Sequence, residues 1–217
     1  MVAAERKRGR PPDEEARSRR REEILGCAAR VFAAGGYQTT DMQAIADAAG
    51  VAKGTLYLYF PGKEELFLAA VDQGMTRMRA AVDAAIEGVR DPLAVFERGI
   101  LAYLRFFEDH PEQVELLIQE RAEFRDRRQS TYFRHREEGA AHWHALLGEL
   151  LESGRFRDLP LTRIDDVMND LVYGTMFTNH FSGRHKPIET QASDILDIVF
   201  RGILSDEERA RMRDIAS

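Results

Sequence analysis

Apolar residues recur along most of the chain at the three- and four-residue spacing that is typical of amphipathic helices. Helices are expected over about residues 18–34, 40–49, 51–60 and 63–89, and around the apolar positions of 93–107, 114–124, 132–151, 164–177 and 195–203. The alternating apolar and polar runs that are typical of strands are missing from the sequence. The pattern therefore predicts an all-α protein with about nine helices.

The two shortest predicted helices meet at Gly50. Met42 and Ile45 lie on the apolar face of the first, and Thr40 with Gln43 three residues later forms the pattern of a capping box. A glycine suits the left-handed conformation that ends many helices, so Gly50 is expected to form a tight turn. Two helices joined by such a turn describe a helix-turn-helix.

The second of these helices keeps small, basic and hydroxyl-bearing side chains once its apolar anchors, Leu56 and Phe60, face inward. The remaining residues are Lys53, Gly54, Thr55, Tyr57 and Tyr59. Such residues suit a groove lined by phosphates and base edges. The pattern therefore favours a nucleic-acid-binding surface on this helix.

The run 50–60 (GVAKGTLYLYF) is followed by Lys63-Glu64-Glu65-Leu66 and preceded by four shorter matching pieces. These pieces are Phe32, Gly36-Tyr37, Thr39-Thr40 and Ile45-Ala46. Together they resemble the DNA-binding domain of TetR-type transcriptional regulators over about residues 18–66. Ala52 departs from the pattern, because the family often has a capping Ser or Thr there, and a lost cap costs about 1 kcal/mol. Beyond residue 66 the family shares no motif, only an expected set of helices.

The resemblance implies specific DNA contacts. Lys53, Gly54 and Gln43 are expected to face base edges in the major groove. Thr40, Thr55, Tyr57, Tyr59 and Lys63 are expected to hold phosphates. The resemblance also implies a homodimer on a palindromic double-stranded DNA operator, and a second, helical domain that binds a small-molecule effector.

Positive charge is concentrated at the N-terminal end, although the whole chain has a formal net charge of -6. Residues 1–65 contain 11 Lys and Arg against 10 Asp and Glu, whereas the remainder contains 20 against 27. Residues 1–21 alone contain 8 against 4. Because an acidic body repels a polyanion and a basic arm attracts one, this distribution is typical of a protein that binds DNA with one end.

Residues 1–17 lack apolar periodicity and are expected to be a disordered basic arm. Within it, Lys7-Arg8-Gly9-Arg10-Pro11 resembles the core of an AT-hook, and Arg8 and Arg10 would then enter a narrow A·T minor groove. A second interpretation stays open, in which the arm is a solvated tail that attracts phosphates without specificity.

The predicted organisation is this arm, a helix-turn-helix DNA-binding domain at residues 18–66, and a helical ligand-sensing and dimerisation domain at 67–217. The helix over 63–89 is too long for the small domain alone. We expect it to be the only element shared by both domains.

Aromatic, Met and polar residues on the later helices are candidates for a ligand pocket. They are Met75, Met78, Phe96, Tyr103, Phe107, Arg121, Phe124, Trp143, Met168, Phe177 and His180. For each residue taken singly, a role in the core or on the surface is the simpler interpretation. Flexible Met and aromatic side chains favour a lipophilic or aromatic effector, oriented by a polar group such as Arg121 or His180.

Residues 164–177 are apolar on almost every side of the predicted helix, so they must be covered from more than one direction. A second apolar helix at 195–203 can pair with this one, and two copies would form a four-helix bundle across a two-fold axis. The candidate interface residues are Val172, Met176, Leu196, Val199, Phe200 and Ile203.

Enzyme motifs are missing, since the chain has no G-x-S-x-G, no phosphate-binding glycine loop and no H-E-x-x-H. His142 and His144 are two residues apart on a predicted helix and point to different sides, so we expect no metal site, no cofactor and no catalysis. The lone Cys27 excludes an internal disulfide, and no apolar run is long enough to span a membrane. We expect a cytoplasmic protein.

The sequence therefore predicts a sequence-specific DNA-binding transcriptional regulator, acting as a repressor that a small lipophilic or aromatic ligand releases from its operator. Two alternatives stay open. One is an architectural DNA-binding protein without a ligand switch, and the other is an enzyme built on a helical bundle.

Overall fold

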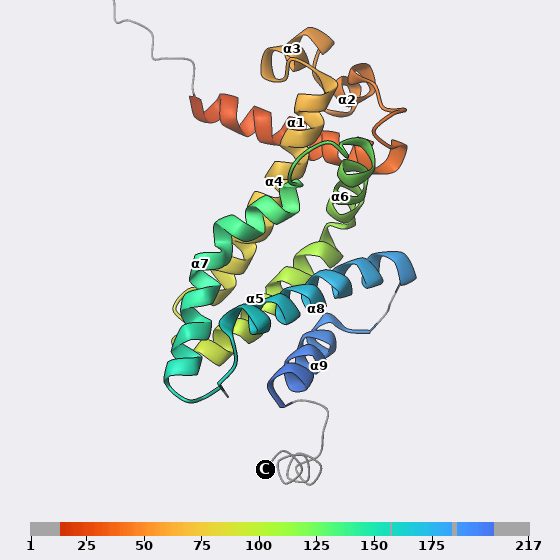
Figure 1. Ribbon diagram of the computed structural model, residues 1–217. Coiled ribbons are helices and arrows are strands. Elements are labelled where there is room, and N and C mark those ends of the chain that lie inside the picture. Colours follow the sequence, from red (N-terminus) through yellow and green to blue (C-terminus); the bar gives the residue numbers. More distant parts are fainter. Residues whose placement is uncertain (1–13, 157, 184–185, 202–217) are drawn as a thin grey trace, which may run out of the picture. The chain divides into compact units, whose positions relative to one another are not determined.

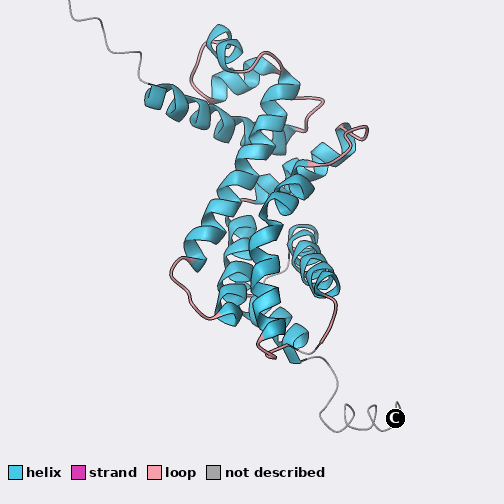
Figure 2. Ribbon diagram, turned by 60° about the vertical axis from the view of Figure 1, so that its left-hand side comes forward, coloured by secondary structure: helices cyan, strands magenta, loops and turns pink. Residues whose placement is uncertain are grey.

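The computed structural model describes residues 14–156, 158–183 and 186–201, and every regular element within these ranges is a helix (Figures 1 and 2). The helices are α1 (Glu14–Gly35), α2 (Met42–Ala48), α3 (Lys53–Tyr59), α4 (Lys63–Ile86), α5 (Pro92–Asp109), α6 (Pro111–Glu123), α7 (Thr131–Glu152), α8 (Leu161–Ser182) and α9 (Ile188–Arg201). The predicted all-α class is confirmed.

The ends of two helices differ from the sequence prediction. Because α1 begins at Glu14, residues 14–17 are helical and do not belong to a disordered arm. Ser18 lies inside α1, where its hydroxyl donates to Glu22 at 3.5 Å. Helix α9 begins at Ile188, well before the apolar run that predicted it, because Ile188, Gln191 and Ala192 are already buried there.

Contacts divide the chain into two compact units. The first unit is Met1–Met75 with Glu115–Tyr132, and the second is Thr76–Val114 with Phe133–Ser217. Helices α4 and α6 each contribute residues to both units, and α7 begins in the first unit and continues in the second. The expectation that one helix alone is shared is therefore wrong, because periodicity cannot show where each end of a helix packs. The predicted domain boundary at residue 66 stays a prediction.

The core of the first unit forms around one face of α1. Ile24, Leu25, Ala28, Ala29 and Phe32 are buried on this face at helical spacing. Helix α2 packs against α1, and α3 packs against α2 (Figure 1). The Phe32 ring meets Phe67 of α4 edge to face, with centroids 5.0 Å apart. This contact between two aromatic rings is part of the apolar core that supports α2 and α3.

In the second unit, α5 packs against both α8 and α9. The predicted start of α5 is confirmed, because the Asp91 carboxylate accepts from the backbone N–H of Ala94 at 3.2 Å and Pro92 occupies the first turn. Helix α5 buries a broad apolar face through Val95, Phe96, Ile100, Tyr103, Leu104, Phe106 and Phe107. This face forms the core of the second unit.

Candidate nucleic-acid interface

Helix α2 is started by Asp41. Its backbone is extended (φ -112, ψ 165), and its carboxylate accepts from the backbone N–H of Ala44 at 2.8 Å. The predicted capping box of Thr40 with Gln43 is therefore wrong. The Gln43 amide instead donates to Asp47 at 2.8 Å. An acceptor one residue further along satisfies the same free N–H groups, and sequence spacing does not distinguish the two arrangements.

The turn between α2 and α3 depends on Gly50. Its φ is +63, in the left-handed region, and a Cβ there would meet no atom within 4 Å. The conformation, and not crowding, therefore favours glycine at this position, as predicted. The Val51 N–H then donates to the Ala46 carbonyl at 3.0 Å and closes the turn.

Helix α3 begins without a side-chain cap. Ala52 occupies the cap position and makes no side-chain hydrogen bond. Its carbonyl accepts from the N–H groups of Thr55 at 2.8 Å and Leu56 at 3.1 Å, so backbone bonds alone start the helix. The missing side-chain cap expected from Ala52 is confirmed, and its cost in stability stays a prediction.

Helix α3 presents one face to the core and one to solvent. Leu56 is fully buried, as is Phe60 just beyond the helix, whereas Lys53, Gly54 and Tyr57 are exposed. Thr55 and Tyr59 are half-buried at the edges of the exposed face, and Gln43 is exposed on α2. Every residue of α3 that is predicted to contact DNA is therefore at least partly exposed.

Leu58 is a further exposed residue of α3 that the predicted contacts do not include. It is 76% exposed, although it is a large apolar residue on a helix that packs against its neighbour. Leu58 is two residues from both Leu56 and Phe60, so helical periodicity places it on the opposite side of the helix although its side chain is apolar. Its exposure beside Tyr57 adds an apolar contact point to the exposed face of α3.

Lys63 holds the turn between α1 and α2. Its ammonium donates to the carbonyls of Tyr37 at 2.9 Å, Gln38 at 3.2 Å and Thr40 at 3.1 Å. It also lies 4.5 Å from the centroid of the Tyr37 ring. An ammonium has three donors, and all three are used here. A phosphate contact by Lys63 would have to break at least one of these bonds.

Thr40 and Tyr37 are part of the same turn. Thr40 is only 6% exposed, so its hydroxyl is not presented to a phosphate and its predicted role as a DNA contact is not supported. Burial, followed by the nearby Glu64 carboxylate, raises the pKa of the Tyr37 hydroxyl above its ordinary value. The Tyr37 ring packs against Phe32 and Phe67 beside this turn, with centroids 6.0 Å and 5.0 Å away.

The C-terminal part of α6 contacts α1 and the turn that follows it, within the first unit. The Gln119 amide donates to the Phe32 carbonyl at 3.0 Å, and Gln38 donates to Glu123. The Phe124 ring lies 5.1 Å from Tyr37 and 5.6 Å from Phe67, centroid to centroid. Phe124 is thus a packing residue of the first unit, and its predicted place in a ligand pocket of the second unit is wrong.

The residues predicted for one ligand pocket are distributed over both units. Met75, Arg121 and Phe124 belong to the first unit, and Arg121 is exposed. The other predicted residues belong to the second unit, namely Met78, Phe96, Tyr103, Phe107, Trp143, Met168, Phe177 and His180. No single unit contains the whole predicted set, because helical periodicity does not show with which unit a residue packs. The ligand pocket itself stays a prediction.

The aromatic residues of the second unit pack tightly together. The Phe96 and Trp143 rings lie 5.4 Å apart, and a Cβ on Gly99 would come within 2.6 Å of the Trp143 ring. The Tyr103 hydroxyl donates to the Met176 sulfur at 3.4 Å. Because Gly99 on α5 has no side chain, it leaves room for the Trp143 ring of α7.

Two side-chain oxygens on α8 and α9 are buried, and the described residues supply neither with a hydrogen-bond donor. The side-chain oxygens of Asn179 on α8 and Gln191 on α9 are buried and, within the described part of the chain, accept no hydrogen bond. Leaving a buried acceptor unpaired costs about 1–3 kcal/mol. A bound molecule with a donor would remove that cost.

The predicted dimer residues divide into three groups. Met176 and Leu196 are buried inside the second unit, so their assignment to an interface is wrong. Val172, Val199 and Phe200 are half-buried, and the Phe200 ring lies 5.5 Å from Phe156. Ile203 lies outside the described residues. The exposed apolar side chains of these two helices are instead Val167, Leu171, Phe181 and Ile198.

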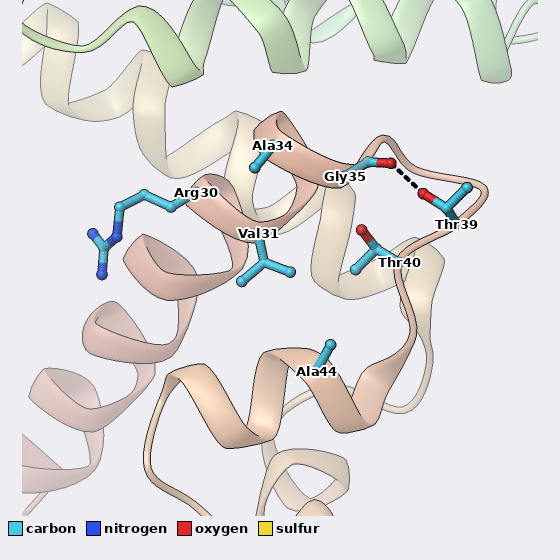
Figure 3. Close-up of a pocket in the computed structure, with 7 residues that line it drawn as sticks. All are labelled: Arg30, Val31, Ala34, Gly35, Thr39, Thr40 and Ala44. Atoms are coloured by element: carbon cyan, nitrogen blue, oxygen red, sulfur yellow. Dashed lines mark hydrogen bonds between the residues drawn. The ribbon is translucent and has the colours of Figure 1, made fainter.

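A surface hollow lies between α1 and α2 in the first unit (Figure 3). Its volume is about 490 Å³, and it is lined by Arg30, Val31, Ala34, Gly35, Thr39, Thr40 and Ala44. The Thr39 hydroxyl donates to the Gly35 carbonyl at its rim, and the Arg30 guanidinium points away from it (Figure 3). None of the predicted pocket residues lines this hollow.

Across residues 14–156, 158–183 and 186–201, no three His, Cys, Asp or Glu side chains are grouped so that they could hold a metal ion. None of the described helices combines the length and the apolarity needed to cross a membrane. Arg8 and Arg10 of the predicted AT-hook lie outside the described residues.

Comparison with known proteins identifies the family. A family model described as "Bacterial regulatory proteins, tetR family" matches residues 24–70. The HTH-type transcriptional repressor KstR2 of Mycobacterium tuberculosis is 31% identical over 159 residues, which are 71% of this chain and 74% of KstR2. The chain belongs to the TetR family. A solved structure of the ketosteroid transcriptional regulator KstR2 from the same organism has a TM-score of 0.63 at 26% identity, over 86% of this chain and 96% of that chain.

Other TetR-family comparisons cover different parts of the chain. The HTH-type transcriptional repressor KstR of Mycobacterium tuberculosis is 41% identical over 75 residues, so this chain spans only 34% of that relative's length. The fold is also that of the transcriptional regulator FadR from Bacillus subtilis, solved with stearoyl-CoA, with a TM-score of 0.69 at 21% identity over 84% of this chain and 99% of that chain. Because the family consists of regulatory proteins, membership excludes the enzyme on a helical bundle.

Proposed function

We propose that this TetR-family protein is a sequence-specific DNA-binding repressor that a small lipophilic or aromatic ligand releases from its operator. The observation that carries the proposal is the exposed face of α3. Lys53, Gly54, Tyr57 and Leu58 are exposed on this face, and Leu56 on the opposite side is buried in the core. A helix that is anchored on one side and polar on the other can enter the major groove.

The side chains of this face suggest a division of roles. Lys53 and Gly54 at the start of α3, with Gln43 on α2, would contact base edges, since basic and amide side chains match the acceptors of guanine and adenine. Thr55, Tyr57 and Tyr59 would donate hydroxyl bonds to phosphates. Leu58 would contact the thymine methyl group or a sugar.

The test is a binding profile on selected oligonucleotides. Lys53→Ala should relax specificity at one or two base pairs at a cost of about 1–3 kcal/mol, because the alanine side chain cannot bond to a base edge. Tyr57→Phe, which removes only a hydroxyl, should weaken all operators to a similar degree. Gln73→Ala on α4, which is not among the proposed contacts, serves as the control. An unchanged profile for Lys53→Ala would refute the base contact.

The dimer is the second part of the proposal. The exposed Val167, Leu171 and Phe181 form an apolar stripe along α8, and Ile198 of α9 is exposed as well. The same stripe on a second copy would cover it across a two-fold axis. Two recognition helices would then meet half-sites about 34–36 Å apart on a palindromic operator.

The ligand is the third part. The aromatic and Met side chains of the second unit, including Phe96, Tyr103 and Trp143, would surround an apolar molecule. The unpaired oxygens of Asn179 and Gln191 would accept hydrogen bonds from its polar end, in place of the predicted Arg121. The similarity to KstR2, a ketosteroid transcriptional regulator, and to FadR, solved with stearoyl-CoA, agrees with a lipophilic class of ligand.

An architectural DNA-binding protein without a ligand switch is the alternative. Such a protein binds through phosphates and deformable DNA, so its affinity depends on salt and little on sequence. A titration of operator and random duplexes at matched salt separates the two functions. A regulator keeps a large affinity ratio, whereas an architectural protein does not.

A further inference from the structure

Helix α1 carries four arginines in its first turns, and the structure separates them into two pairs. Arg19 lies 3.8 Å from Glu15, and Arg20 lies 2.8 Å from Glu23. These two guanidinium groups are already balanced by carboxylates one turn away. Within the described ranges, no ion pair with a carboxylate is found for Arg17 or Arg21.

The guanidinium groups of Arg17 and Arg21 lie instead over two aromatic rings at the C-terminal end of α3. The Arg17 guanidinium carbon is 5.9 Å from the centroid of the Tyr59 ring, and that of Arg21 is 5.2 Å from the Phe60 ring. The two arginines are four residues apart and continue the stripe of Ile24 and Ala28 beyond the buried core. A guanidinium held over an aromatic face is fixed in place but keeps its charge and its donors.

The position of this pair matters because Tyr59 is one of the proposed phosphate contacts. Both arginines are exposed, and the first turns of α1 extend past α2 and α3 in both ribbon views (Figures 1 and 2). Glu14 lies one turn before Arg17 and Glu22 follows Arg21, so the surroundings are not purely basic. Of the four arginines in these first turns, Arg17 and Arg21 are nevertheless the two that the described structure leaves without a carboxylate pair.

We infer that Arg17 and Arg21 form a phosphate-binding edge beside the C-terminal end of α3, which extends the DNA contact surface beyond the helix-turn-helix. The inference rests on the proposed function. Its partner is the sugar-phosphate backbone of the operator next to each half-site. A planar guanidinium can donate two parallel bonds to one phosphate, and stacking on Tyr59 and Phe60 orients it before DNA arrives.

The experiment compares two matched double variants of the full chain. Arg17→Gln with Arg21→Gln removes the stacked pair, and Arg19→Gln with Arg20→Gln removes the same charge from the carboxylate-paired positions. Affinity for one selected operator and one random duplex is measured across a series of salt concentrations. The slope of log affinity against log salt should fall by about 0.9 for each phosphate that the variant no longer binds.

We expect a clear fall in slope, on both duplexes, for the variant of Arg17 and Arg21, and a smaller fall for the control variant. Arg17→Lys with Arg21→Lys should keep most of the slope, because the charge remains. Equal slopes for the two glutamine variants would overturn the edge and leave only general charge. A lower melting temperature with an unchanged slope would also overturn it, since the pair would then be structural.

The wild-type protein distinguishes this inference from the proposed function. If the wild-type protein prefers its operator over random DNA but the salt slope is unchanged in the Arg17 and Arg21 glutamine variant, only the inferred phosphate-binding edge is refuted. If the wild-type protein shows no preference for any selected operator, the proposed function itself fails.

Discussion

At the scale of single residues, the DNA-binding unit depends on a few polar side chains that satisfy backbone groups. The Asp41 carboxylate holds the first free N–H groups of α2, and the Lys63 ammonium holds three carbonyls of the turn before it. Glu120, almost fully buried on α6, accepts from both the N–H and the hydroxyl of Thr131 and so starts α7. Each replaces a protein–water bond at a helix end or turn.

Asp41 makes the stability of this unit depend on pH. The hydrogen bond from the Ala44 backbone N–H is the largest cause and, with a smaller one from Gln43, outweighs desolvation and lowers the pKa of the Asp41 carboxyl below its ordinary value of 3.8. Since the folded-state pKa is the lower one, the stabilisation is complete above about pH 3.8 and is lost as the pH falls through the folded-state pKa.

Asp41→Ala should therefore lower the melting temperature at neutral pH, and the difference from the wild-type protein should narrow as the pH falls below about 3.8. Thermal unfolding followed by circular dichroism at a series of pH values measures this. Asp41→Asn keeps a neutral acceptor and should lose less at neutral pH. A difference that stays constant with pH would show that the charge of the carboxylate is irrelevant.

At the scale of helices, α8 shows how one element serves two surfaces. Met168 and Met176 face the core of the second unit, and the Tyr103 hydroxyl donates to the Met176 sulfur. Phe181, at 70% exposed, lies with Leu171 on the outer side. A helix with apolar residues on both sides is stable in water only if the outer side is also covered.

Leu171→Glu combined with Phe181→Glu should convert the protein into folded monomers, because two carboxylates at a two-fold interface would face their own copies. Sedimentation velocity measures the mass, and operator binding should weaken because the two half-sites are no longer bound together. Ala145→Glu, on the exposed side of α7, is the control. A dimer that persists in the double variant would refute this interface. Met176→Glu is not a useful test, since it would place a charge in the core.

At the scale of the whole molecule, helices α4 and α6 each contribute residues to both units. Helix α4 begins at Lys63, which holds the turn before α2, and continues into the second unit. Helix α6 ends at Glu123, which accepts from Gln38 in that turn, and Gln119 one turn earlier donates to the Phe32 carbonyl of α1. A ligand in the second unit can affect DNA binding only if it favours one arrangement of these helices over another.

An apolar effector should raise the melting temperature of the protein and lower its affinity for the operator by a linked factor. Trp143→Phe should change the effector concentration needed for release, because the tryptophan ring fills the space over Gly99 and the phenylalanine ring is smaller. Its operator affinity without effector should stay close to that of the wild-type protein. Lys53→Ala is the matched control, which should alter DNA binding and leave effector binding unchanged.

A screen of lipophilic and aromatic compounds by thermal shift supplies the effector. If no such compound changes either the melting temperature or the operator affinity, the ligand switch is refuted. Regulation would then depend on the amount of the protein or on a protein partner.

The sequence by itself determined the helical class, the helix-turn-helix and the family. These depend on local physics. The left-handed conformation at Gly50, the capping of α5 by Asp91 and the inward-facing Leu56 each follow from a residue and its neighbours within one turn. Such features leave a pattern in the sequence because their causes lie close together along the chain.

Only the tertiary structure decided which side of each helix is covered and by what. Phe124 packs on Tyr37, far away in the sequence, and Met176 faces Tyr103, so neither serves the role that its helical spacing suggested. The four arginines in the first turns of α1 are chemically identical in the sequence, yet two are paired with carboxylates and two are stacked on aromatic rings. Periodicity fixes the direction of a side chain on its own helix, but the partner it meets depends on the packing of distant segments.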